Sequence, residues 1–141
     1  MKTLPSNITV LLQDFSEISD IKEKFEFLLE ISEDLEFFPE NQKIQENKIQ
    51  GCASDAWILV EGDNPVKISG EGDAVISKGI LAFFIQCFEG LSASEILQIR
   101  DAFPEIFTES GVISSLSPSR ANGAKAMLDK IYSECEKNNT E

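Results

Sequence analysis

Cys52 is the residue of this sequence whose position best suits covalent chemistry. It follows Gly51, between a polar stretch that ends near Lys48 and an apolar run that begins at Trp57. Glycine permits backbone angles and close approaches that other residues resist, and loops on a rigid scaffold often carry reactive groups. A free cysteine is also often an inert, buried apolar side chain, and no base stands beside this one. Position alone therefore favours the inert interpretation and leaves a nucleophile open.

The other two cysteines are weaker candidates. Cys87 falls on the apolar face of the most hydrophobic segment, which predicts a place in the core. Cys135 stands between Glu134 and Glu136 near a charged C-terminus, where carboxylates disfavour a thiolate. We expect replacement of Cys135 by serine to change almost nothing. The spacings include no CxxC pair, so neither a redox dithiol nor a cysteine-only zinc site is supported.

Histidine is absent from the sequence, which excludes Ser-His-Asp and Cys-His catalysis and histidine-ligated zinc. Any chemistry must therefore use Cys, carboxylates, Lys, Arg or Tyr. Arg120 is one of only 12 lysines and arginines, and it lies at the expected start of the last helix. A positive charge there opposes the helix dipole. An isolated arginine is usually a surface or ion-pairing residue, so this position is only a hint of another role.

Length and composition narrow the class of protein. The chain has 141 residues, 42% of them hydrophobic, which suffices for one core and predicts a single domain over residues 1–141. A net charge of −13 disfavours nucleic acid and anionic membrane surfaces and suits a basic patch on another protein. We find neither a membrane-spanning run nor the apolar segment of a signal peptide. Three cysteines in no paired framework fit a reducing compartment, so we expect a cytoplasmic protein.

Helical periodicity predicts the N-terminal elements. Apolar residues recur at helical spacing over residues 21–35, with Asp20 as the N-cap, and a shorter helix is expected over residues 6–14. Pro39 ends this pattern, and the polar residues 40–48 are typical of a loop.

The middle of the chain changes to a strand pattern. Residues 57–68 hold an apolar run, a Gly-Asp-Asn-Pro turn and alternating apolar residues, which predicts an antiparallel hairpin. Ile49 could begin a preceding strand. Asp73 is expected to cap the next helix, and residues 75–87 are apolar nearly all round, as in a core helix.

Two further helices complete the predicted fold. Ser92 and Glu95 have the spacing of a capping box and open a short helix to about Arg100. The last helix follows Pro118 and runs towards Cys135. Strands clustered between flanking helices predict an α+β fold, with a small antiparallel sheet packed against helices.

Four blocks of sequence are informative together: Asn-Lys-Ile-Gln-Gly-Cys-Ala-Ser-Asp-Ala-Trp at 47–57, Gly-Glu-Gly-Asp-Ala at 70–74, Ser-Lys-Gly at 77–79 and Leu-Ser-Pro-Ser-Arg-Ala-Asn-Gly at 116–123. Together they resemble the SufE/CsdE family of sulfur acceptors. The blocks occur in the order and spacing of the family, and the resemblance spans nearly the whole chain. It implies a fold shared with Fe–S scaffold proteins of the IscU type.

The resemblance also implies roles for individual residues. Cys52 matches the cysteine that accepts sulfur as a persulfide, Arg120 the arginine near it that could stabilise the thiolate, and Asp73 the acidic residue that could control the acceptor loop. Cys87 and Cys135 match no acceptor position. The implied partner is a cysteine desulfurase that itself carries pyridoxal phosphate, so we expect no cofactor and no metal on this chain. The implied recipient is a downstream Fe–S scaffold.

We therefore expect a sulfurtransferase-type acceptor that stimulates a cysteine desulfurase and supplies Fe–S cluster assembly. One alternative is an Fe–S scaffold, which should present several cysteines, or cysteine with histidine or aspartate, converging on iron. Another is a regulatory adaptor of the desulfurase in which Cys52 is only structural. The sequence leaves open which desulfurase is the partner and whether the chain forms a homodimer.

Overall fold

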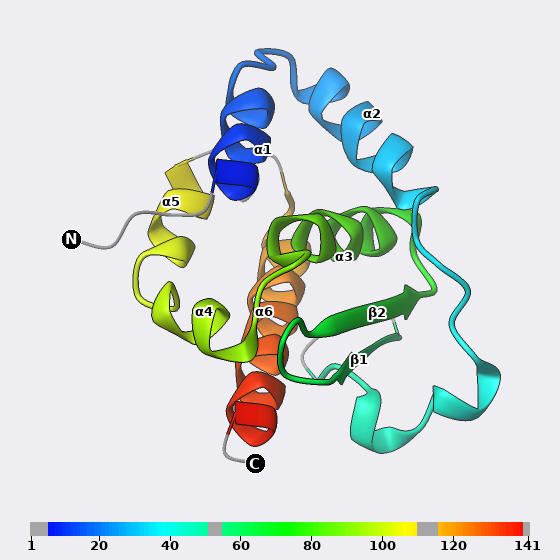
Figure 1. Cartoon of the computed structure of the whole chain (residues 1–141). Coiled ribbons are helices and arrows are strands. Elements are labelled where there is room, and N and C mark those ends of the chain that lie inside the picture. Colours follow the sequence, from blue (N-terminus) through cyan, green and yellow to red (C-terminus); the bar gives the residue numbers. More distant parts are fainter. Residues whose placement is uncertain (1–5, 51–54, 110–115, 140–141) are drawn as a thin grey trace.

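The computed structural model of the chain describes residues 6–50, 55–109 and 116–139. Figure 1 shows helices packed on one side of a small hairpin, so the fold class is α+β, as predicted. The elements in chain order are α1 (Ser6–Ser16), α2 (Ile21–Ser32), two 3-10 turns (Glu40–Gln42 and Gln45–Asn47), β1 (Ala56–Glu61), β2 (Lys67–Gly72), α3 (Val75–Phe88), α4 (Ala93–Gln98), α5 (Phe103–Glu109) and α6 (Pro118–Asn139).

The hairpin is antiparallel, and its register pairs Ala56 with Gly72 at the open end. Alternate residues of β1 are buried, so one face of the hairpin belongs to the core. Gly62 has a φ of 78° in the connecting turn, a value that glycine adopts without strain. The strand expected to begin at Ile49 is reduced to a short contact, in which the Ile49 N–H donates to the Ala56 carbonyl at 2.8 Å.

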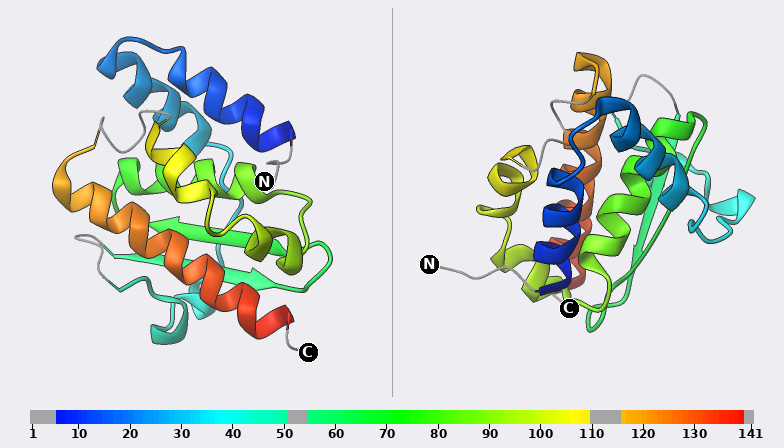
Figure 2. Two further views of the ribbon diagram at one scale, coloured as in Figure 1. Left: turned by 90° about the vertical axis from the view of Figure 1, so that its left-hand side faces the viewer. Right: turned by 90° about the horizontal axis from the view of Figure 1, so that it is seen from above.

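Two helices cover the same face of the hairpin. α3 packs on β2 and α6 packs on β1, and the two helices also contact each other, as Figure 2 shows. A Cβ on Gly70 would lie 3.3 Å from the Leu81 side chain, so the glycine in β2 lets α3 approach closely. α2 lies against the other side of α3. A Cβ on Gly79 would lie 2.7 Å from the Leu28 carbonyl oxygen, which shows how tight this second contact is.

Two of the three predicted helix caps, those at Asp20 and Ser92, are confirmed. The Asp20 carboxylate accepts a hydrogen bond from the Lys22 N–H at 2.8 Å and begins α2. At α4 the Ser92 hydroxyl accepts from the Glu95 N–H at 3.1 Å, and the Glu95 carboxylate accepts from the Ser92 N–H at 3.0 Å. These reciprocal bonds form the capping box that the spacing indicates.

α5 is an element that the sequence patterns above do not predict. Its Phe103 and Phe107 are buried, and the Phe107 ring centroid lies 5.0 Å from that of Phe84. Phe103 similarly lies 5.2 Å from Phe88. α5 is therefore stabilised by aromatic packing on α3 rather than by its own length. Within the described residues, no helix is long and apolar enough to cross a bilayer.

Candidate functional site

Cys52 lies outside the described residues, but the chain on both sides of it is placed. Ile49 before it is buried and is held to Ala56 by the backbone hydrogen bond described above. After it, the Asp55 carbonyl accepts a hydrogen bond from the Asp73 N–H at 2.9 Å. Both flanks of the segment that carries Cys52 are therefore fixed to the open end of the hairpin.

Side chains reinforce the flank that precedes Cys52. The Asn47 side chain is buried and donates to the Gln42 carbonyl at 2.8 Å and to the Gln42 side-chain oxygen at 3.1 Å, which joins the two 3-10 turns. Lys48 pairs with Asp55 across the segment, with 3.1 Å between the charged atoms. Both members of that pair are substantially exposed, so it contributes little stability. The buried amide is therefore the stronger anchor.

Asp73 does not cap α3, and this prediction is wrong. The N-cap position belongs to Ala74, whose carbonyl accepts from the Lys78 N–H at 3.0 Å, and the cap makes no side-chain hydrogen bond. The Asp73 backbone continues the hairpin ladder through its bond to Asp55, which leaves its side chain one position too early to cap the helix. α3 is held by its burial instead. Asp73 is thus tied through its backbone to Asp55, where the described chain resumes after residues 51–54, the Cys52 segment.

Arg120 lies in the first turn of α6, with an exposed side chain. Its backbone N–H is 3.3 Å from the Ser117 hydroxyl oxygen, which accepts the bond. Figure 2 shows that the start of α6, the start of α3 and the open end of the hairpin lie at the same end of the molecule. The fold therefore brings the elements that carry Arg120 and Asp73 to the end where the Cys52 segment is attached.

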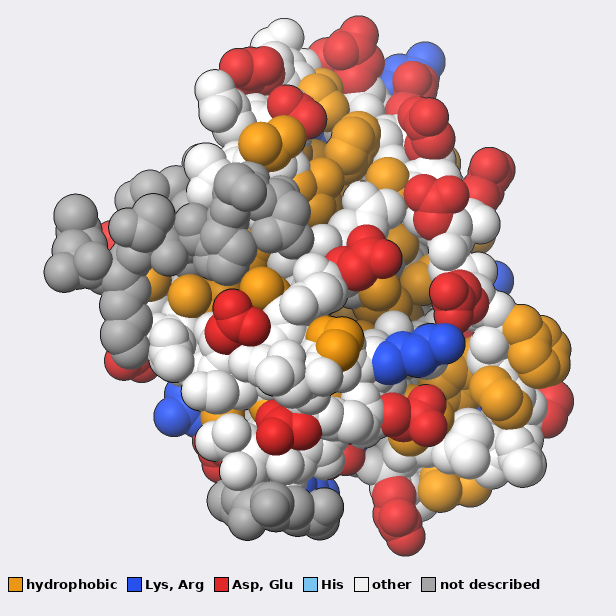
Figure 3. Space-filling model, in the orientation of Figure 1, with side chains coloured by type: hydrophobic (Ala, Val, Ile, Leu, Met, Phe, Trp, Pro, Cys, Tyr) orange, Lys and Arg blue, Asp and Glu red, His pale blue; other side chains and the backbone are white. Residues whose placement is uncertain are grey.

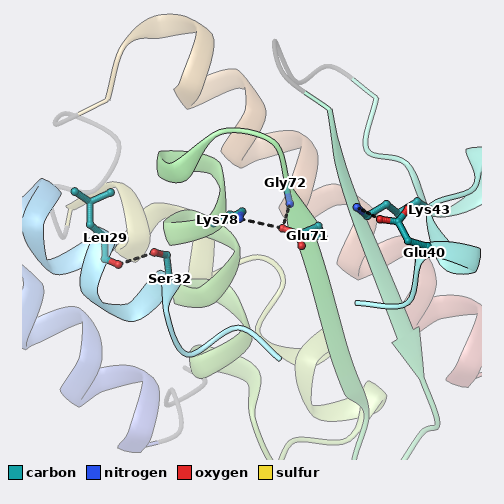
Figure 4. A network of polar contacts seen from close by, with 7 residues as sticks. All are labelled: Leu29, Ser32, Glu40, Lys43, Glu71, Gly72 and Lys78. Atoms are coloured by element: carbon teal, nitrogen blue, oxygen red, sulfur yellow. Dashed lines mark hydrogen bonds and ion pairs between the residues drawn. The ribbon is translucent and has the colours of Figure 1, made fainter. Parts of the chain in front are cut away.

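Lysines near the hairpin are paired with carboxylates (Figure 4). Lys43 lies 2.9 Å from Glu40, and the hydrogen bond to this carboxylate is the main reason that the pKa of Lys43 is raised. Lys78 lies 3.5 Å from Glu71, whose carboxylate also accepts the Gly72 N–H at 2.9 Å. Paired lysines offer little net positive charge to a nearby thiolate. Among the described residues, no ion pair involves Arg120.

Cys87 and Cys135 are both fully buried. Burial raises the pKa of Cys87, and its predicted core position is confirmed. Burial, followed by the charges of Glu134 and Asp63, raises the pKa of Cys135 to about 11. The expectation that Cys135 could be replaced without effect needs correction, because α6 turns this residue into the core although its neighbours in sequence are charged. Both thiols stay protonated near neutral pH, so neither suits nucleophilic attack.

Comparison with known proteins decides the family. The SufE family, described as an Fe-S metabolism associated domain, matches residues 9–135. This chain belongs to the SufE family. An uncharacterised SufE-like protein of Rhizobium meliloti is 35% identical over 136 residues, which cover 93% of this chain and 96% of that protein. An uncharacterised SufE-like protein of Synechocystis is 38% identical over 122 residues, which cover 86% of this chain and 75% of that protein.

Two more distant comparisons agree with this assignment. SufE-like protein 1, chloroplastic/mitochondrial, of Arabidopsis thaliana is 30% identical over 130 residues, which cover 91% of this chain and 34% of that protein. The solution structure of a hypothetical protein from Thermus thermophilus has the same fold, with a TM-score of 0.81 at 18% identity and coverage of 99% of this chain and 100% of the other. The SufE resemblance of the motifs is thereby confirmed, and it associates this chain with sulfur transfer and Fe–S metabolism.

Proposed function

We propose that Cys52 of this SufE-family chain accepts a sulfur atom as a persulfide from a pyridoxal-phosphate-dependent cysteine desulfurase and passes it to a downstream Fe–S scaffold. The observation that carries this proposal is the contrast among the three cysteines. Cys87 and Cys135 are buried thiols with raised pKa values. The described chain on both sides of Cys52 is fixed to the open end of the hairpin, and loops on a rigid scaffold often carry reactive groups.

The accepting step is a thiol–disulfide type of exchange. The Cys52 thiolate attacks the terminal sulfur of the persulfide on the desulfurase cysteine. One S–S bond forms on Cys52 while the S–S bond on the partner breaks, and the partner cysteine leaves as a thiolate. Electrons balance between the two proteins, so the step needs no external oxidant or reductant. Delivery repeats the exchange, with Cys52 as the leaving thiolate and a nucleophile of the recipient as the attacking group.

The neighbouring residues have separate proposed roles. Arg120 supplies a positive charge that favours the Cys52 thiolate, since the lysines of this region are paired with carboxylates. Asp73 controls one flank of the Cys52 segment through its backbone bond to Asp55. The chemistry requires free thiols, so we propose that the protein works in the reducing cytoplasm. Its net charge of −13 would suit a basic docking surface on the desulfurase, which supplies the pyridoxal phosphate.

Desulfurase turnover tests this function. The measurement is the rate of alanine formation from cysteine by the desulfurase, with increasing amounts of this chain added. Wild type should accelerate turnover by removing the persulfide, and Cys52→Ser should not. Cys135→Ala is the matched control, because it removes a buried cysteine, and it should retain the stimulation once circular dichroism has shown that it is folded. Arg120→Ala should lower the maximal rate without shifting the concentration that gives half of it.

The alternatives give different results in the same experiment. Full stimulation by Cys52→Ser would make the chain a regulatory adaptor and would overturn the acceptor role. A brown chromophore that forms on the chain when iron, sulfide and desulfurase are added would indicate a scaffold instead.

A further inference from the structure

A groove of about 1120 Å³ lies between α1, the chain after α2, β2 and the last turn of α3. Figure 3 shows hydrophobic side chains gathered in this hollow, between the upper helices and the sheet, with acidic side chains around it. The groove is lined by the first residues of β2 and the end of α3. The Cys52 segment is attached instead at the end of β2 and near the start of α3. The groove is therefore a separate surface from the proposed sulfur site.

The floor of the groove is apolar. Ala82 and Phe88 of α3 form part of it and are buried. Val10 of α1 also lines the groove and is 56% exposed, so a large apolar side chain at the edge of this floor is open to solvent. The half-buried apolar residues that continue this surface are Leu11, Leu35, Ile68 and Ile85. Contiguous apolar surface of this kind marks a binding site more often than scattered exposed residues do.

The rim of the groove is acidic. Its carboxylates come from three parts of the chain: Asp14 from α1, Asp34 and Glu36 from the residues after α2, and Glu89 from the end of α3. Among the described residues of the lining, the one cation is Lys67, which pairs with Glu36 at 3.3 Å. These described residues, four carboxylates and one lysine, give a formal charge of −3 around an apolar floor.

We propose that this groove binds a basic amphipathic helix of a partner protein. The apolar stripe of such a helix would cover Val10 and the half-buried residues beside it, and flanking lysines or arginines would meet the rim carboxylates. An extended strand would have to pair with the edge of β2 that borders the groove. This fits less well, because Gly70 at that edge is already buried. A second copy of this chain also fits less well, since each copy carries a net charge of −13. The proposal is independent of the sulfur chemistry at Cys52.

Titration calorimetry with a synthetic peptide tests the proposed contact between an apolar helix stripe and the floor of the groove. The peptide has leucines in a single helical stripe flanked by lysines, and a second peptide of the same composition has a scrambled order. Val10→Gln should weaken binding of the striped peptide about tenfold, or about 1.4 kcal/mol, because the polar amide cannot replace the apolar contact of valine with the stripe. Val75→Gln is the matched control, since Val75 is also 56% exposed but lies outside the groove, and it should bind as wild type does.

The acidic rim needs its own comparison, because any cationic peptide is attracted to this chain. The double variant Asp14→Asn, Glu89→Gln should weaken binding roughly three- to tenfold, as expected for two partly exposed charges. The double variant Glu26→Gln, Glu105→Gln removes two exposed carboxylates outside the groove and should have a much smaller effect. A benzophenone group in the peptide stripe should crosslink to α1, β2 or the end of α3.

Three results with the peptides would overturn the proposal. They are equal binding of the scrambled peptide, equal weakening by the control variants, and crosslinks that map outside the groove. Any of them would mean that the attraction is diffuse charge rather than a helix seated on the apolar floor. A dimer of the chain that dissociates in Val10→Gln would likewise overturn it in favour of a second copy as the occupant.

Discussion

At the scale of single residues, burial decides how Cys87 and Cys135 can react. The pKa of the Cys135 thiol rises from 9.0 in an ordinary setting to about 11 in the fold, mainly because the thiolate would be buried. Between these two values the folded protein keeps a proton that the unfolded chain has lost. The contribution of Cys135 to the free energy of unfolding is therefore fully present below pH 9 and is lost as the pH rises towards 11.

This linkage gives a pH-dependence that Cys135→Ala should remove. Urea denaturation in reducing buffer gives the free energy of unfolding of both proteins. The value for wild type minus that for Cys135→Ala should fall by about 2 kcal/mol between pH 9 and pH 11. Groups whose titration does not depend on Cys135 contribute to both proteins and cancel in the difference. Ser133→Ala on the exposed side of the same helix should show no such trend. A flat difference for Cys135→Ala would mean that the fold does not hold this thiol protonated.

At the scale of elements, local patterns predict what local interactions decide. The hairpin, the core helix and the caps at Asp20 and Ser92 follow from residues close together in sequence. Such patterns do not predict α5, because its stability comes from contacts of Phe103 and Phe107 with α3. The spacing of these two phenylalanines, four residues apart just beside Pro104, was the available signal of a short helix. The predicted cap at Asp73 was wrong because the Asp73 backbone extends the hairpin through its hydrogen bond to Asp55, and the N-cap position of α3 falls on Ala74.

The contact between α2 and α3 can be tested at Gly79. Replacing glycine by alanine within a helix usually stabilises it by roughly 0.5–1 kcal/mol. Here the added Cβ would lie 2.7 Å from the Leu28 carbonyl oxygen and 2.9 Å from the Leu28 Cβ, so the helices must separate. Gly79→Ala should therefore lower the free energy of unfolding, by about 1–3 kcal/mol. Gly72→Ala is the control, because its Cβ would meet Ser77 at an ordinary 3.4 Å. A stabilised Gly79→Ala would contradict this packing.

At the scale of the whole molecule, the fold gathers residues that the sequence leaves far apart. Cys52, Asp73 and Arg120 stand in three separate blocks, and only the family resemblance relates them in the sequence. The structure places the flanks of Cys52, the start of α3 and the start of α6 at one end, and the acidic groove elsewhere. The ion pairs of the hairpin could not be predicted, because pairs such as Lys48 with Asp55 depend on the path of the chain between them. The two proposals therefore place two separate binding surfaces on this small protein.

The position of transferred sulfur tests the central claim most directly. The chain is incubated with a cysteine desulfurase and cysteine, trapped with an alkylating agent, digested and mapped by mass spectrometry. We predict one additional sulfur atom on the peptide that contains Cys52, and none on the peptides that contain Cys87 or Cys135, whose thiols are buried. An additional sulfur on either buried cysteine in place of Cys52, or none on the chain while the desulfurase turns over, would contradict the account.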